Sequence, residues 1–92
     1  MTMNNDDLSL LPNIGEVLKD RLIEIGIKTA ADLRKAGSEN AFLALREIDP
    51  GACINELMAL EGAVQNIRWH HLDETKKQEL KEFLRLVSLN KK

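Results

Sequence analysis

The sequence is poor in the residues that build disulfides, β-sheets and membrane spans. Its 92 residues include one cysteine, two prolines, no tyrosine and only 3% aromatic residues. A single cysteine excludes an internal disulfide and suits a reducing compartment. No apolar run approaches the roughly 18 residues of a membrane span, and no signal-peptide pattern opens the chain. These features together predict a cytoplasmic protein.

The residues that are abundant favour helices. Hydrophobic residues make up 43% of the chain, and leucine, alanine, glutamate and lysine dominate. This composition predicts one all-α domain with a single core. We expect it to span residues 7–89 as a compact five-helix domain, with a disordered N-terminus (residues 1–6) and a C-terminal tail (residues 90–92).

Charge is distributed unevenly along the chain. Residues 1–75 hold 7 basic and 13 acidic groups, a balance of −6, whereas residues 76–92 hold 6 and 2, a balance of +4. Only the C-terminal segment would attract a polyanion, and the chain as a whole lacks the basic excess of a nucleic-acid-binding protein.

The stretch 50–67 is predicted to form the central buried helix. At about 100° per residue, one side carries large apolar residues and the other carries small ones, so neighbours can pack on both sides. Asp49 is expected to cap this helix and Pro50 to occupy its first position. Cys53 would then face the core as an inert thiol.

Local signals place the other helices. A single turn at 7–11 should end at Pro12, and a helix over 16–25 should end at Gly26 in a left-handed conformation. Thr29 and Asp32 resemble a capping box that opens a short helix ending at Gly37. Ser38 should cap the next helix and Asp73 the last one. The inward stripe of the last helix is expected to be Leu80, Phe83, Leu84 and Val87.

The turn Leu11-Pro12-Asn13-Ile14-Gly15 followed by a helix resembles a helix-hairpin-helix motif, in which the N–H groups of the turn approach a DNA phosphate. The candidate nucleic-acid-binding residues are therefore Asn13, Ile14, Gly15 and Lys19. Asn13 replaces the usual first glycine but tolerates a left-handed conformation. Glu16 puts a carboxylate where the phosphate would lie. A hairpin that only packs helices is the alternative.

The ordered set of short motifs resembles a known family. Six short motifs occur in the same order as in the C-terminal domain of TfoX/Sxy, bacterial regulators of competence for DNA uptake. They are Leu11–Gly15, Gly26–Thr29, Asp32-Leu33, Gly51–Cys53, Ala59–Ala63 and Ile67–His70. The resemblance covers roughly residues 8–88. It implies an all-helical domain associated with transcriptional activation of DNA-uptake genes. The α/β domain that precedes it in longer members is missing here, so a stand-alone copy is expected.

Glu61 is the most informative polar residue, because it falls within the apolar face of the central helix and needs a partner there. The predicted partners are Arg68, Trp69 and the backbone N–H groups of the connector that follows this helix (residues 67–72), which would make Glu61, Arg68 and Trp69 a structural clamp. A ligand-binding or catalytic carboxylate is the alternative. Trp69 is interpreted as a capstone of the core, with a docking residue as the other interpretation.

The sequence shows no arrangement typical of catalysis or of a metal site. His70 and His71 are adjacent and no second ligand pair lies at zinc spacing, so neither a metal nor a cofactor is predicted. Lys76, Lys77, Lys81 and Arg85 form either a solvated face or a partner surface. We therefore expect a non-enzymatic regulatory or binding module that acts by protein contact, with the transcription machinery or itself, or by weak DNA contact. A self-associating structural protein, such as a homodimer without a nucleic-acid role, is the alternative.

Overall fold

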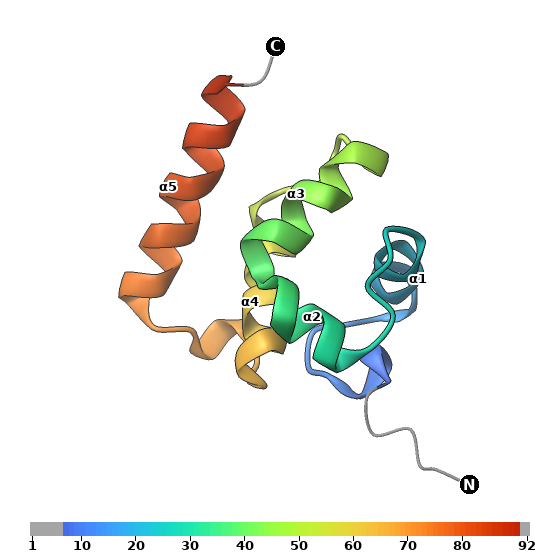
Figure 1. The fold of residues 1–92 in the computed structure, drawn as a ribbon. Coiled ribbons are helices and arrows are strands. Elements are labelled where there is room, and N and C mark those ends of the chain that lie inside the picture. The colour runs from blue at the N-terminus through green and yellow to red at the C-terminus, as the bar shows by residue number, and fades with distance from the viewer. Residues whose placement is uncertain (1–6, 91–92) are drawn as a thin grey trace, which may run out of the picture.

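Five α-helices make up most of residues 7–90, which are the residues that the computed structural model describes (Figure 1). They are α1 (Glu16–Glu24), α2 (Ala30–Ala36), α3 (Ser38–Ile48), α4 (Ile54–Gln65) and α5 (Glu74–Asn90), with two short 3₁₀ turns, η1 (Leu8–Leu10) and η2 (Trp69–His71). The predicted all-α, five-helix fold is confirmed. No helix in the described residues is long and apolar enough to cross a membrane. The expectations for residues 1–6 and 91–92 lie outside the described part of the chain.

The helix ends of the N-terminal half follow the local signals. Asp7 caps η1 by accepting a hydrogen bond from the backbone N–H of Ser9. Its hydrogen bonds with Ser9, and to a smaller extent the one with Lys19, lower the pKa of Asp7 to about 2. Gly26 has a φ of 94°, and the N–H of Ile27 folds back onto the carbonyl of Leu22 at 2.9 Å. The Thr29 hydroxyl accepts from the N–H of Asp32 at 3.0 Å, as a capping box requires. The caps at Gly26 and Thr29 are as predicted.

The predicted cap of α3 is wrong. Ser38 is the first residue of the helix, and Gly37, with a φ of 84°, occupies the capping position. The Ser38 hydroxyl instead donates to the carboxylate of Glu61 on α4 at 2.6 Å. A tertiary contact has therefore taken the side chain that the local sequence suggested as a cap.

The predicted start of the central helix is also wrong. α4 begins at Ile54 with Cys53 at its N-cap, four residues later than the predicted start. Asp49 caps only a turn that does not continue into the helix. One of its oxygens accepts from the N–H of Gly51 at 3.1 Å, as an N-cap side chain does, and the other pairs with Arg21 at 2.6 Å. Cys53 is consequently exposed, and its prediction as a core thiol fails.

The central position of α4 is nevertheless confirmed. Five of its residues are buried, more than in any other helix, and they lie on both sides of it. Its most extensive neighbour is α3. The largest fully buried side chains come from η1 and all five helices: Leu8, Leu22, Leu33, Phe42, Leu45, Leu57, Leu60 and Leu80.

α5 lies at the edge of the fold and packs against α4 (Figure 1). Within its predicted inward stripe, Leu80 is fully buried and Phe83 and Leu84 are half-buried against the core. Further along, Leu86 and Leu89 are exposed. The second half of α5 therefore carries apolar side chains that the other residues of the range 7–90 leave exposed.

Candidate functional site

The hairpin turn and the connector after α4 form one shared hollow of about 400 Å³. It is lined by Asn13, Ile14, Gly15, Ala59, Arg68 and Trp69. Three of the four candidate nucleic-acid-binding residues thus lie together, and α1 begins at their side. The fourth, Lys19, does not line this hollow, and its ammonium forms an ion pair with Asp7 at 3.1 Å.

The Asn13 side chain joins the hairpin turn to α4 and to the connector after it by hydrogen bonds. Asn13 has a φ of 72°, which confirms the predicted left-handed turn. Its amide nitrogen donates to the carbonyls of Ile67 at 3.0 Å and Ala59 at 3.3 Å, and its amide oxygen accepts from the N–H of Trp69 at 3.2 Å. The side chain is thus committed to holding the connector against α4, which favours the packing interpretation of the hairpin.

Gly62 allows the close approach on which this arrangement depends. A Cβ at this position would lie 2.5 Å from the Asn13 amide nitrogen, 2.7 Å from the Ile67 carbonyl oxygen and 3.2 Å from the Trp69 Cα. Real Cβ contacts are longer than this, so only glycine fits without displacing the backbone. The connector can cross α4 here because Gly62 has no side chain.

The predicted bond between Glu61 and the connector is wrong. Glu61 accepts from the Ser38 hydroxyl and from the Gln65 amide, each at 2.6 Å. The reason is the helix phase: Gly62 faces the connector, and Glu61, 100° away around α4, faces the start of α3. The clamp on the connector is Asn13, which the sequence suggested only as a hairpin residue.

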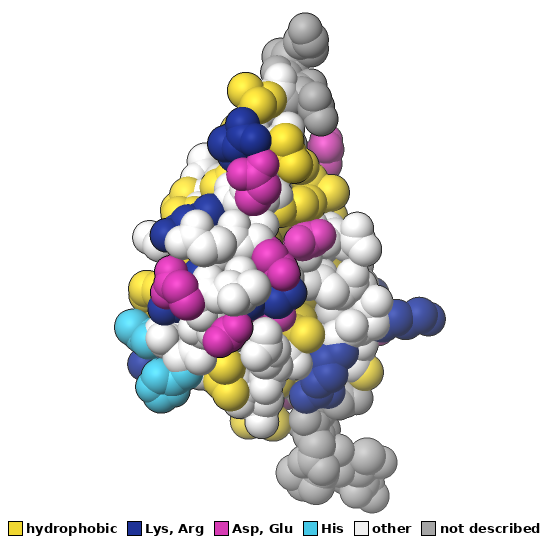
Figure 2. Space-filling model, turned by 90° about the vertical axis from the view of Figure 1, so that its left-hand side faces the viewer, with side chains coloured by type: hydrophobic (Ala, Val, Ile, Leu, Met, Phe, Trp, Pro, Cys, Tyr) yellow, Lys and Arg dark blue, Asp and Glu magenta, His cyan; other side chains and the backbone are white. Residues whose placement is uncertain are grey.

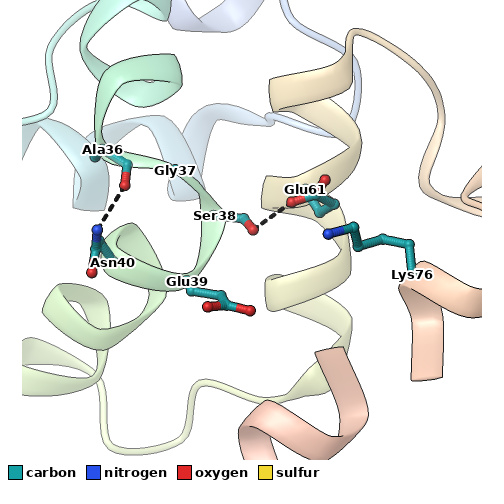
Figure 3. Close-up of a pocket in the computed structure, with 7 residues that line it drawn as sticks. All are labelled: Ala36, Gly37, Ser38, Glu39, Asn40, Glu61 and Lys76. Carbon is teal, nitrogen blue, oxygen red and sulfur yellow. Dashed lines mark hydrogen bonds between the residues drawn. The ribbon is translucent and has the colours of Figure 1, made fainter. Parts of the chain in front are cut away.

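Glu61 borders a second, shallow hollow of about 300 Å³ at the start of α3 (Figure 3). Lys76 extends from α5 toward the Glu61 carboxylate in this view. A hydrogen bond to Glu79 raises the pKa of Lys76, and the charges of Glu61 and Glu39 contribute in the same direction. Ser38 lines this hollow but is only 4% exposed, and its hydroxyl is engaged as the donor to Glu61.

Arg68 and Trp69 do not form the predicted clamp with Glu61. Arg68 is exposed and lines the hairpin hollow. The local sequence of the hairpin does not indicate this cation, because Arg68 lies 53 positions beyond Gly15. Trp69 is half-buried against the core, as a capstone would be, and its ring stacks on His70 with centroids 4.2 Å apart. Within residues 7–90, no three His, Cys, Asp or Glu side chains come close enough together to hold a metal ion.

The basic residues of α5 are partly neutralised. Lys76 pairs with Glu79 at 3.0 Å and Arg85 with Glu82 at 2.6 Å, while the Lys77 ammonium donates to the His70 carbonyl at 3.3 Å. The hydrogen bonds between Arg85 and Glu82 lower the pKa of Glu82 and raise that of Arg85. Figure 2, which looks onto the side occupied by α5, shows charges of both signs intermixed there.

The arrangement can be compared with known proteins. The protein-family model for the TfoX C-terminal domain matches residues 4–84 of this chain. The chain belongs to the TfoX C-terminal domain family. This TfoX C-terminal domain has no match among curated proteins.

Two solved structures resemble this TfoX C-terminal domain closely. One is an uncharacterised protein from Listeria monocytogenes in a triclinic crystal form, with 56% identity and a TM-score of 0.88 over 89% of this chain and 93% of that one. The other is a protein of unknown function from Listeria monocytogenes in a tetragonal form, with 57% identity and a TM-score of 0.86 over 88% and 99%. They support the fold and carry no statement of activity.

Proposed function

We propose that the chain is a non-enzymatic binding module that acts in the cytoplasm by protein contact, in the regulation of DNA-uptake genes that its family implies. The observation that carries this proposal is the exposure of large apolar side chains on helices at two edges of the fold. Val17 on α1 is 64% exposed and Leu89 on α5 is 67% exposed. Leu86 lies one turn before Leu89 on the same side of α5 and is also exposed, and Ile23 is a further exposed apolar residue of α1. Exposed large apolar side chains of this kind are typical of protein-contact sites.

The hairpin supports protein contact more than DNA contact. The Asn13 side chain is engaged within the fold, and Lys19 is paired with Asp7. Arg68 is the cation that lines the hollow, and the exposed carboxylate of Glu16 lies in the first turn of α1 beside it. One cation beside a carboxylate neutralises little phosphate charge, and neutralised phosphates supply most of non-specific DNA affinity.

Binding of a labelled DNA duplex should therefore be undetectable by fluorescence anisotropy at physiological salt and faint at low salt. The slope of log K against log salt should be shallow, since each neutralised phosphate contributes about −0.9. Glu16→Lys should strengthen binding at low salt by removing the carboxylate from the hairpin. Tight binding of the unmodified chain with a steep salt slope would instead make DNA the principal partner.

Protein contact itself can be tested by photo-crosslinking in cells. A benzophenone amino acid placed at Val17 or Leu89 should give discrete protein adducts, whereas the same group at Asn55, an exposed polar position on α4, should not. Mass spectrometry would identify the partner, and an adduct of twice the chain's mass would indicate a second copy. If neither Val17 nor Leu89 gives a protein adduct, the proposal is wrong.

A further inference from the structure

The exposed side of α1 carries a row of acidic residues. Glu16, Asp20 and Glu24 follow one another at intervals of four, which places them along one side of the helix. All three are exposed, and none of them forms an ion pair within the described residues 7–90. Val17, at 64% exposure, lies on the same side. α1 thus presents an unpartnered face that combines three negative charges with apolar surface.

The outer side of α5 carries a basic row at the same spacing. Lys77, Lys81 and Arg85 also follow one another at intervals of four, so both rows extend over about 12 Å. Lys81 is exposed and forms no ion pair in the described part of the chain. Lys77 is half-buried and its ammonium donates to the His70 carbonyl, while Arg85 pairs with Glu82 of its own helix. Leu89, at 67% exposure, continues this side of α5 by one turn beyond Arg85.

The two rows cannot meet within one molecule. Figure 1 places α5 at one edge of the fold and α1 at the opposite edge, with α3 and α4 between them. Their matched spacing and opposite charge therefore fit two different molecules. Ridges formed by residues four apart also pack favourably into the grooves of another helix.

We propose that α1 of one copy docks antiparallel on α5 of a second copy, with Glu16 facing Arg85, Asp20 facing Lys81 and Glu24 facing Lys77. The contact covers Val17 of one copy and Leu89 of the other. It joins two different surfaces, so association is head to tail and can continue to further copies. This inference rests on the proposed function of protein contact and names the partner as a second copy of the chain.

The central residue of each row supplies the test. Sedimentation velocity of the unmodified chain should show association that increases with protein concentration and decreases with salt, because the contact is between opposite charges. Asp20→Lys and Lys81→Glu should each weaken association by roughly tenfold or more, since each places like charges opposite one another. An equal mixture of the two variants, and a chain carrying both substitutions, should associate again.

Glu47→Lys is the matched control. It makes the same charge change as Asp20→Lys at an exposed position on α3, outside both rows, and should leave association unchanged. A chain that stays monomeric at all concentrations would overturn the inference. So would association that neither Asp20→Lys nor Lys81→Glu weakens, or a mixture that does not recover. If the chain is monomeric while Val17 or Leu89 still crosslinks to another protein, the proposed function stands without this contact.

Discussion

Replacing Gly62 with alanine should lower the free energy of unfolding by about 2–3 kcal/mol, as overpacking of a tight contact does. The added methyl group would lie 2.5 Å from the Asn13 amide nitrogen and 2.7 Å from the Ile67 carbonyl oxygen. One is a side-chain atom held by hydrogen bonds to the backbone, and the other is backbone, so neither can rotate away cheaply. Urea denaturation followed by circular dichroism measures the change.

Gly15→Ala provides the control for Gly62→Ala. A Cβ at Gly15 would meet no atom within 4 Å, and the φ of −92° there suits any residue. Because Gly15 is the N-cap of α1, where glycine is preferred to alanine, this variant should lose some stability, but no more than about 1 kcal/mol. Equal unfolding free energies for Gly62→Ala and the unmodified chain would mean that the connector does not cross α4 at Gly62.

Replacing Asn13 with glycine should cost about 2–3 kcal/mol of stability. Glycine keeps the left-handed turn but removes the bonds to Ala59, Ile67 and Trp69, each worth about 0.5–1.5 kcal/mol. Asn13→Ala should cost roughly 1 kcal/mol more, because alanine is strained at a φ of 72°. The same denaturation measurement ranks the two variants.

Asn66→Gly is a matched control for Asn13→Gly. Asn66 also has a positive φ, of 63°, at the end of α4, but its side chain is exposed and makes no tertiary hydrogen bond among the described residues. Asn66→Gly should therefore be close to neutral, since glycine adopts this conformation without strain. If Asn13→Gly were as mild as Asn66→Gly, the amide of Asn13 would not hold the connector.

Local signals in the sequence correctly predicted most helix ends. Gly26 and Gly37 lie at the ends of α1 and α2, and Thr29 lies at the start of α2. Such residues are recognisable in the sequence because they act on backbone groups within about four residues of themselves. Both errors at helix starts involve a contact with a residue distant in sequence. Asp49 caps only a turn at Gly51 while its other oxygen pairs with Arg21, and the Ser38 hydroxyl donates to Glu61.

The candidate site was predictable only in part. The hairpin residues Asn13, Ile14 and Gly15 were identified because turn chemistry is local. The sequence also predicted that neighbours pack on the small side of the 50–67 helix, which is where Gly62 lies. The partner of Glu61 and the position of Arg68 beside the hairpin were not predictable. Both depend on which residues, distant in sequence, face each other after packing.

The sequence by itself determined the all-α class, five helices, a central helix that packs on both sides and the left-handed turn at Asn13, because composition, periodicity and turn chemistry act over short stretches of chain. Only the tertiary structure decided that Asn13 holds the connector, that Glu61 bonds to Ser38 and that α1 and α5 present their charged rows at opposite edges. Those outcomes depend on how the helices are rotated and placed against one another. That arrangement follows from packing the whole core at once, which no local stretch of sequence specifies.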